Sequence, residues 1–183
     1  MINYKKNHKG FTLLEMIVSI GLFTVILFIS SSAFLAVLNA DRKSRATRTA
    51  MDNLNLSLED MSRRVKTGTT YNCGGGAGVA DCVAPGLNSI AFTEQDGTTR
   101  TIYRLQTDAF GKKFIERERS GVVLRATAPE IDISNLAFVV GGTTVGDIVQ
   151  PYVIILVNGT VSGGSVSSSF KIQTMVTQRA YDI

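Results

Sequence analysis

The most pronounced hydrophobic pattern in the chain is a long apolar segment close to its start. Residues 16–40 are 25 consecutive positions without a charged side chain. As a helix rising about 1.5 Å per residue, this segment would be about 37 Å long, enough to cross a hydrocarbon core of about 30 Å with some tilt. Helices in the cores of soluble proteins are usually shorter and amphipathic. The pattern therefore predicts a membrane-spanning helix.

A cleaved secretory signal is the alternative interpretation of this segment. The apolar region of such a signal is about 7–15 residues long and ends in a small-x-small cleavage site. The apolar segment here is longer, although Ser31, Ala33 and Ala36 offer small residues at which a peptidase could cut. A secreted protein that starts beyond the segment therefore remains an alternative.

The next segment, residues 41–66, continues the helical pattern, but here apolar residues are interspersed among polar and charged ones. It contains no proline and no glycine. Its apolar residues recur at intervals of three and four, which is the spacing of one helix face: Met51, Leu54, Leu58, Met61 and Val65. Lys66 and the arginines before it suit the negative end of a helix dipole, and Gly68 is a stop signal. We expect one helix over residues 11–66, with the apolar face of its second half packed on the following domain.

Residues 67–183 show short β-type runs separated by turns. We expect strands at 88–93, 99–105, 114–119, 122–126, 131–140, 152–157 and 167–178. Asp96-Gly97 is a strong hairpin signal, and Asn158-Gly159 with residues 162–165 is expected to turn the chain into its last strand. The predicted fold class is α+β, with a long N-terminal helix packed on an antiparallel β-sheet head.

An acidic residue lies at the start of the apolar segment, within the heptapeptide Lys9-Gly10-Phe11-Thr12-Leu13-Leu14-Glu15. A carboxylate costs roughly 2.5–3.5 kcal/mol at the centre of a bilayer and less near its edge. Glu15 is therefore either a carboxylate that reaches water at the interface, or one that acquires a positive partner after processing or assembly.

This heptapeptide, followed by an apolar helix, resembles the class III signal of type IV prepilins and type II secretion pseudopilins. The resemblance covers about the first 30 residues. It implies that a prepilin peptidase cuts between Gly10 and Phe11 and N-methylates Phe11. It further implies four regions: a cleaved basic leader at 1–10, a transmembrane and filament-core helix at 11–40, an amphipathic helix at 41–66, and an extracytoplasmic head at 67–183.

The resemblance also implies how the chain would assemble. Cleavage creates an α-ammonium group at Phe11, four residues from Glu15, and opposite charges stabilise each other in a medium of low dielectric constant. In a stack of parallel helices, Glu15 of one subunit would meet the amine of its neighbour and set the register. The implied partners are other pilin or pseudopilin subunits, the prepilin peptidase, an inner-membrane platform protein and an assembly ATPase. The chain has no proline before Pro85, which is closer to minor pilins and J- or H-type pseudopilins than to many major pilins.

The charge distribution bears on possible partners. The formal net charge is +4, but Lys5, Lys6 and Lys9 belong to the first ten residues, and residues 67–183 carry nine basic and ten acidic side chains, a net charge of −1. Binding to nucleic acid requires clustered positive charge, so this balance argues against it. A membrane-anchored binding module for DNA uptake or adhesion remains the alternative, with a local basic patch if two strands pair: Arg100, Arg104, Lys112 and Lys113.

Composition argues against an enzyme. The only histidine is His8, inside the expected leader, so the mature chain would lack histidine for acid–base catalysis or metal binding. The spacing of Asp81, Glu94 and Asp96 fits no calcium loop. We therefore expect no metal, no cofactor and no catalytic site.

Two further features concern the head. Cys73 and Cys82 follow the membrane segment, and in an oxidising compartment they would form a disulfide, with reduced thiols as the alternative. The run Glu116-Arg117-Glu118-Arg119 alternates charge along an expected strand. We interpret this alternation as a solvated face.

Overall fold

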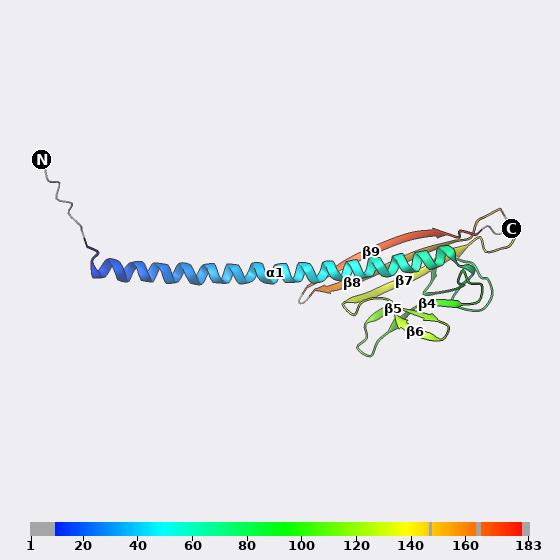
Figure 1. Cartoon of the computed structure of the whole chain (residues 1–183), viewed down its shortest axis with the longest axis horizontal. Coiled ribbons are helices and arrows are strands. Elements are labelled where there is room, and N and C mark those ends of the chain that lie inside the picture. Colours follow the sequence, from blue (N-terminus) through cyan, green and yellow to red (C-terminus); the bar gives the residue numbers. More distant parts are fainter. Residues whose placement is uncertain (1–9, 147, 164–165, 181–183) are drawn as a thin grey trace. The chain divides into compact units, whose positions relative to one another are not determined.

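The computed structural model describes residues 10–146, 148–163 and 166–180. The chain forms two compact units, Met1–Arg42 and Lys43–Ile183. One helix, α1 (Leu13–Thr67), accounts for the described structure of the first unit and continues into the second (Figure 1). This confirms the helix expected from the apolar segment and the stripe behind it. Residues 1–9 of the expected basic leader, with Lys5, Lys6, His8 and Lys9, lie outside the described residues.

The second unit contains nine strands in two antiparallel sheets. The strands are β1 (Thr69–Cys73), β2 (Cys82–Leu87), β3 (Ser89–Thr93), β4 (Arg100–Thr107), β5 (Lys113–Arg119), β6 (Val122–Arg125), β7 (Ile131–Gly141), β8 (Tyr152–Gly163) and β9 (Val166–Thr177). One sheet has the order β1-β3-β4-β5-β6 and the other the order β2-β7-β8-β9. The α+β class is confirmed, but the strands divide between two sheets where the sequence suggested one.

The core of the second unit lies between α1 and the sheets. The predicted stripe is buried, with one change: Ala50 is 2% exposed, whereas Met51 lies at the margin of the core. Aromatic and β-branched side chains from both sheets complete the core, among them Phe92, Phe138 and Ile155. Each such side chain contributes roughly 1.5–3 kcal/mol when fully buried. The amphipathic half of α1 is therefore one layer of the head's own core.

Two strands were not expected from the sequence. β1 and β2 flank a glycine-rich loop, and β2 contains Pro85 and Gly86, which are poor strand residues. β2 is the edge strand of its sheet, where proline is tolerated. At Gly86, whose φ is +81°, a Cβ atom would lie 2.4 Å from the carbonyl oxygen of Phe138. The pairing of β2 with β7 depends on this close approach, which cannot be predicted from a sequence pattern.

The turn expected at Asn158-Gly159 is wrong, because both residues lie inside β8. Gly159 pairs with Ile133 of β7 and with Phe170 of β9. A Cβ atom there would lie 2.5 Å from the Asp132 carbonyl oxygen and 2.8 Å from the Phe170 ring. This glycine therefore serves close packing within a central strand. Of the residues 162–165 expected to turn the chain, 164 and 165 lie outside the described residues.

The charge alternation along β5 is not a solvated face, contrary to the sequence interpretation. Arg104 of β4 pairs with Glu116 at 2.6 Å and with Glu118 at 2.8 Å. Arg117 pairs with Asp60 of α1 at 3.1 Å, and its side chain is 22% exposed. The alternating charges of β5 therefore face opposite charges: its glutamates pair with Arg104 of β4, and Arg117 pairs with Asp60 of α1.

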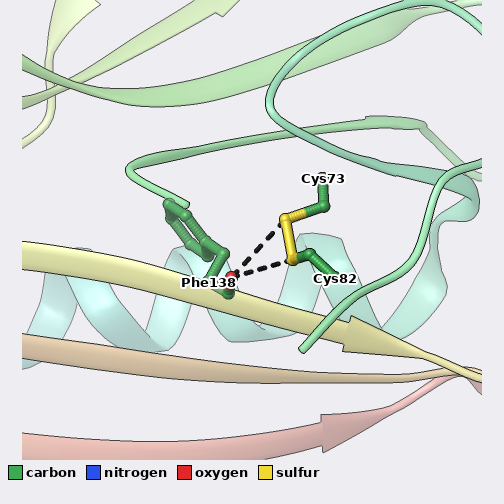
Figure 2. Close-up of a disulfide and its surroundings, with 3 residues drawn as sticks. All are labelled: Cys73, Cys82 and Phe138. Atoms are coloured by element: carbon green, nitrogen blue, oxygen red, sulfur yellow. Dashed lines mark hydrogen bonds between the residues drawn. A yellow bond between two sulfur atoms is a disulfide. The ribbon is translucent and has the colours of Figure 1, made fainter. Parts of the chain in front are cut away.

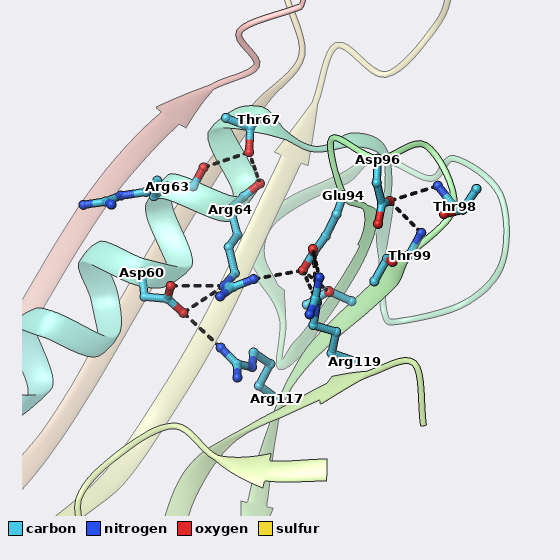
Figure 3. Close-up of polar contacts among 11 residues, drawn as sticks. Asp60, Arg63, Arg64, Thr67, Glu94, Asp96, Thr98, Thr99, Arg117 and Arg119 are labelled. Atoms are coloured by element: carbon cyan, nitrogen blue, oxygen red, sulfur yellow. Dashed lines mark hydrogen bonds and ion pairs between the residues drawn. The ribbon is translucent and has the colours of Figure 1, made fainter. Parts of the chain in front are cut away.

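Glu94 joins α1 to the five-stranded sheet (Figure 3). Its carboxylate, 13% exposed, pairs with Arg64 of α1 at 3.1 Å and with Arg119 of β5 at 2.9 Å, and accepts a hydrogen bond from Thr101 at 2.8 Å. Burial alone would raise the pKa of Glu94, but the hydrogen bonds from Arg119 and Thr101 and the two positive charges outweigh it and lower the pKa. The ionised form is therefore stabilised by folding.

We predict that Glu94→Gln lowers the free energy of unfolding by about 2 kcal/mol at neutral pH, because it removes charge-assisted hydrogen bonds from a mostly buried site. A carboxylate with a lowered pKa in the folded state stabilises above its unfolded pKa, near 4.3, and loses this contribution as the pH falls through the folded pKa. The difference between wild type and variant should therefore shrink in acid. Urea unfolding of the full chain in detergent, followed by circular dichroism, measures it.

Glu59→Gln is the matched control. Glu59 pairs with Arg63 on the same helix at 3.0 Å, with side chains 65% and 76% exposed, so its removal should change stability by less than about 0.5 kcal/mol. Equal effects of the two substitutions, or a Glu94 effect that does not change with pH, would contradict the assigned role of Glu94.

Candidate processing and assembly site

The start of α1 leaves the bond between Gly10 and Phe11 outside the helix. The first helical residue is Leu13. Gly10 is exposed, and among the described residues beyond its chain neighbour no atom lies within 4 Å of the position that a Cβ atom would take there; the Phe11 side chain is 77% exposed. Peptidases act on exposed, non-helical chain. Both residues of the expected cleavage site therefore meet the steric requirement for cleavage.

Thr12 and Glu15 form a capping box at the first turn of α1. The Glu15 backbone N–H donates to Thr12 Oγ1 at 3.3 Å, and the Thr12 backbone N–H donates to Glu15 Oε2 at 3.5 Å. The first N–H groups of a helix have no partner within the helix, and in a bilayer no water replaces one. The carboxylate also lies at the positive end of the helix dipole. Glu15 thus has a local role in addition to the predicted role in assembly.

Thr12 was not among the residues expected to act at this site. Its signal is the spacing Thr12-x-x-Glu15 directly before an apolar run, which is the pattern of a capping box. From the sequence, Glu15 was interpreted only as a charge that needs a positive partner, and its spacing from Thr12 was not considered. The structure shows that the same carboxylate accepts a backbone hydrogen bond.

The apolar part of α1 is long and apolar enough to cross a membrane, by length and composition. Its large side chains are exposed within the first unit; Phe28, for example, is 79% exposed. Two of its hydroxyl groups donate to carbonyl oxygens one turn earlier: Thr24 to Gly21 at 2.8 Å and Ser32 to Ile29 at 2.8 Å. Polar groups satisfied in this way are tolerated in lipid. The segment is consistent with membrane anchoring.

Comparison with protein-family models assigns residues 5–31 to the prokaryotic N-terminal methylation motif. This match supports a type IV prepilin-like or pseudopilin N-terminus over residues 5–31. The motif includes Gly10, Phe11, Thr12 and Glu15 and most of the apolar segment. No curated protein and no solved structure shows a significant match. The architecture agrees with the motif: one long helix packs on antiparallel sheets, which is a pilin-like α+β arrangement.

The two cysteines form a disulfide between the two sheets of the head (Figure 2). Cys73 ends β1 and Cys82 begins β2, with Cα atoms 5.9 Å apart. The carbonyl oxygen of Phe138 lies 3.6 Å from Cys73 Sγ and 3.2 Å from Cys82 Sγ. The predicted pairing is confirmed, and it links the strands at the point where the chain passes from one sheet to the other.

The acidic residues weighed as a calcium site do not come together. Asp81 accepts a hydrogen bond from the Thr143 backbone at 3.2 Å, and Glu94 pairs with arginines. Hydrogen bonds from Thr99 and Thr98 lower the pKa of Asp96 to about 2. Within the described ranges, no group of three histidine, cysteine, aspartate or glutamate side chains could hold a metal ion.

The arginines of the basic patch considered for DNA binding are engaged by other groups of the head. β4 and β5 do pair, with Thr107 opposite Lys113. Arg104 is bound to Glu116 and Glu118, and Arg100 donates to the carbonyl oxygens of Gly75 and Gly76. The arginines of the patch are therefore committed to contacts within the head.

We predict that Thr12→Val frays the first turn of α1. Loss of a threonine cap costs about 1 kcal/mol, so the amides of residues 13–16 should exchange with deuterium about five times faster. Hydrogen exchange of the full chain in detergent micelles measures this. Thr12→Ser retains the acceptor oxygen and should behave as wild type. Unchanged exchange in Thr12→Val would contradict the capping box.

Proposed function

We propose that the chain is a minor pilin or pseudopilin, a structural subunit of a type IV pilus or a type II secretion pseudopilus, without enzymatic activity. The observation that carries the proposal is the methylation motif at residues 5–31, placed at the start of a helix that begins at Leu13. The apolar first part of that helix would pack with the helices of other subunits in the filament core. The absence of proline before Pro85 favours a minor subunit.

Processing would precede assembly. A prepilin peptidase would cut between Gly10 and Phe11 and methylate the new terminus. Exposure of Phe11, and the absence of close contacts to Gly10 from the described part of the chain, support this step. Before cleavage the chain would be a single-pass protein of the inner membrane, with Lys5, Lys6 and Lys9 held on the cytoplasmic side by the positive-inside rule. The head would then be extracytoplasmic, in keeping with the disulfide.

Assembly would use the charge of Glu15. A backbone N–H offsets only part of a full negative charge, so a carboxylate in lipid still gains from a cation nearby. The α-ammonium group of Phe11 on a neighbouring subunit would supply that cation and set the register of the helices. The other partners would be the prepilin peptidase, a platform protein in the inner membrane and an assembly ATPase.

Intact-mass and N-terminal peptide analysis of the protein from native membranes tests the processing step. We expect a chain that begins at N-methylated Phe11, and a Gly10→Val variant that retains its leader, because a branched side chain would obstruct the peptidase. A wild-type chain beginning at Met1 would indicate an unprocessed anchor and favour the binding module. A start beyond Ala33 would indicate a secreted protein.

Two variants separate the charge of Glu15 from its capping role. Glu15→Gln keeps a capping-box acceptor but removes the charge, and we expect normal processing with at least tenfold less incorporation into filaments, because an ion pair in lipid is worth more than about 1.4 kcal/mol. Thr12→Val keeps the charge and weakens the cap, and should still incorporate. Quantitative immunoblotting of sheared filaments measures both. The reverse ranking would show that capping, and not charge pairing, limits assembly.

A further inference from the structure

A group of cations directly follows the apolar segment of α1. Residues 16–40 carry no charged side chain, whereas residues 41–48 carry one acidic and four basic side chains, a net charge of +3. All of them lie on one uninterrupted helix, beyond the residues that match the methylation motif. The four basic residues are here called the basic collar: Arg42, Lys43, Arg45 and Arg48.

The charge of the basic collar is largely uncompensated. Among the described residues, Arg42, Lys43 and Arg48 take part in no ion pair. Asp41 is the only carboxylate within the segment, so it offsets one cation at most. The side chains of Arg42, Arg45 and Arg48 are exposed, and Lys43 is half-buried. The collar can therefore reach a partner outside the chain.

The position of the collar matches the headgroup layer of a bilayer. A bilayer is about 40–45 Å thick with its headgroups, and about 30 Å of this is hydrocarbon. Arg42 lies 27 residues beyond Glu15, which is about 40 Å along a helix. With Glu15 at one interface, Arg42 therefore reaches the headgroups of the opposite interface. Arg48 is about 9 Å farther along the axis.

The geometry of a helix directs these side chains toward the membrane. Each Cα–Cβ bond of an α-helix is tilted toward the N-terminus of the helix. For the collar, this is the direction of the apolar segment. Long basic side chains extend their charged ends to the interface from nearby positions. The cations farther along the helix, such as Arg48, can therefore also reach back to the headgroups.

The cations of the collar do not share one face of the helix. At about 100° per residue, the four side chains leave the helix in directions spread over about 220° of its circumference. An acidic patch on a folded protein contacts one face of a helix, whereas lipids surround a single membrane helix on all sides. The arrangement therefore favours a layer of lipid headgroups as the partner.

The chemistry of the collar indicates the class of lipid. Three of its four cations are arginines, and a guanidinium group binds phosphate oxygens through paired hydrogen bonds. A basic residue near an anionic membrane surface contributes about 1 kcal/mol of attraction. A zwitterionic lipid also carries a phosphate, but its own cation compensates the charge. An anionic phospholipid fits the collar best.

We propose that the basic collar binds the phosphate groups of anionic phospholipids on the side of the membrane that holds the head, and so fixes how far α1 emerges before assembly. The proposal rests on the proposed insertion of the apolar segment in a membrane. It adds a lipid partner and a site that lies outside the methylation motif.

Photo-crosslinking tests the lipid contact. The full chain is reconstituted in vesicles of equal parts phosphatidylcholine and phosphatidylglycerol, one of which carries a photoreactive headgroup, and the crosslinked residues are mapped by peptide mass spectrometry. We expect residues 41–49 to crosslink to phosphatidylglycerol at least fivefold more than to phosphatidylcholine, since fivefold corresponds to about 1 kcal/mol. The mapping separates these crosslinks from those to the lysines of the leader.

Two fourfold glutamine variants separate the collar from net charge. Replacement of the collar, Arg42→Gln, Lys43→Gln, Arg45→Gln and Arg48→Gln, should reduce the crosslinking ratio at residues 41–49 to less than twofold. The matched control removes four exposed cations elsewhere in the chain and should leave the ratio unchanged: Arg63→Gln, Lys66→Gln, Lys113→Gln and Lys171→Gln. Glutamine and the basic residues have similar helix propensities, so circular dichroism should show the same helix content.

Flotation of the full chain with vesicles of phosphatidylcholine alone reports insertion of the apolar segment separately. A chain that does not float would overturn the membrane anchor and this proposal together. A chain that floats but crosslinks equally to the two lipids would overturn this proposal alone, and would favour acidic groups of a neighbouring subunit as the partner of the collar. Equal loss of the ratio in the two fourfold variants would also overturn it.

Discussion

A carboxylate at the start of an apolar helix is the constraint on which the N-terminal half of this protein depends. Glu15 would be costly in lipid without partners, and the capping box with Thr12 provides a first one from the backbone. The same box begins α1 at Leu13 and leaves Gly10 and Phe11 outside the helix. The same pair of side chains therefore determines where the helix starts, which bond lies outside it, and where the charge that we propose for assembly is placed.

The head depends on a second set of constraints, which hold two sheets on one helix. The stripe from Ala50 to Val65 is the apolar layer, Glu94 with Arg64 is the polar contact beside it, and the Cys73–Cys82 disulfide closes the crossing between the sheets. Apolar burial supplies most of the stability, whereas the ion pairs and the disulfide specify how the strands are placed.

Periodic features were predictable from the sequence, and features that depend on distant contacts were not. The spacing of the stripe predicted the second half of α1, and the apolar run at 152–157 predicted a strand. β2 and the continuation of β8 through Gly159 depend on close approaches to Phe138, Asp132 and Phe170, which no local pattern reveals. The charges of Glu116 and Arg117 look solvated in sequence because Arg104 and Asp60 are distant along the chain. At the candidate site, the motif identified Gly10, Phe11 and Glu15, whereas Thr12 emerged from the geometry.

The central claim is that this chain is a filament subunit, and the most direct measurement is its distribution after filaments are sheared from cells and separated from membranes. We expect the mature chain, beginning at Phe11, to sediment with the sheared filaments together with other subunits. A mature chain found only in the membrane fraction, while filaments are present in the sheared fraction, would contradict it.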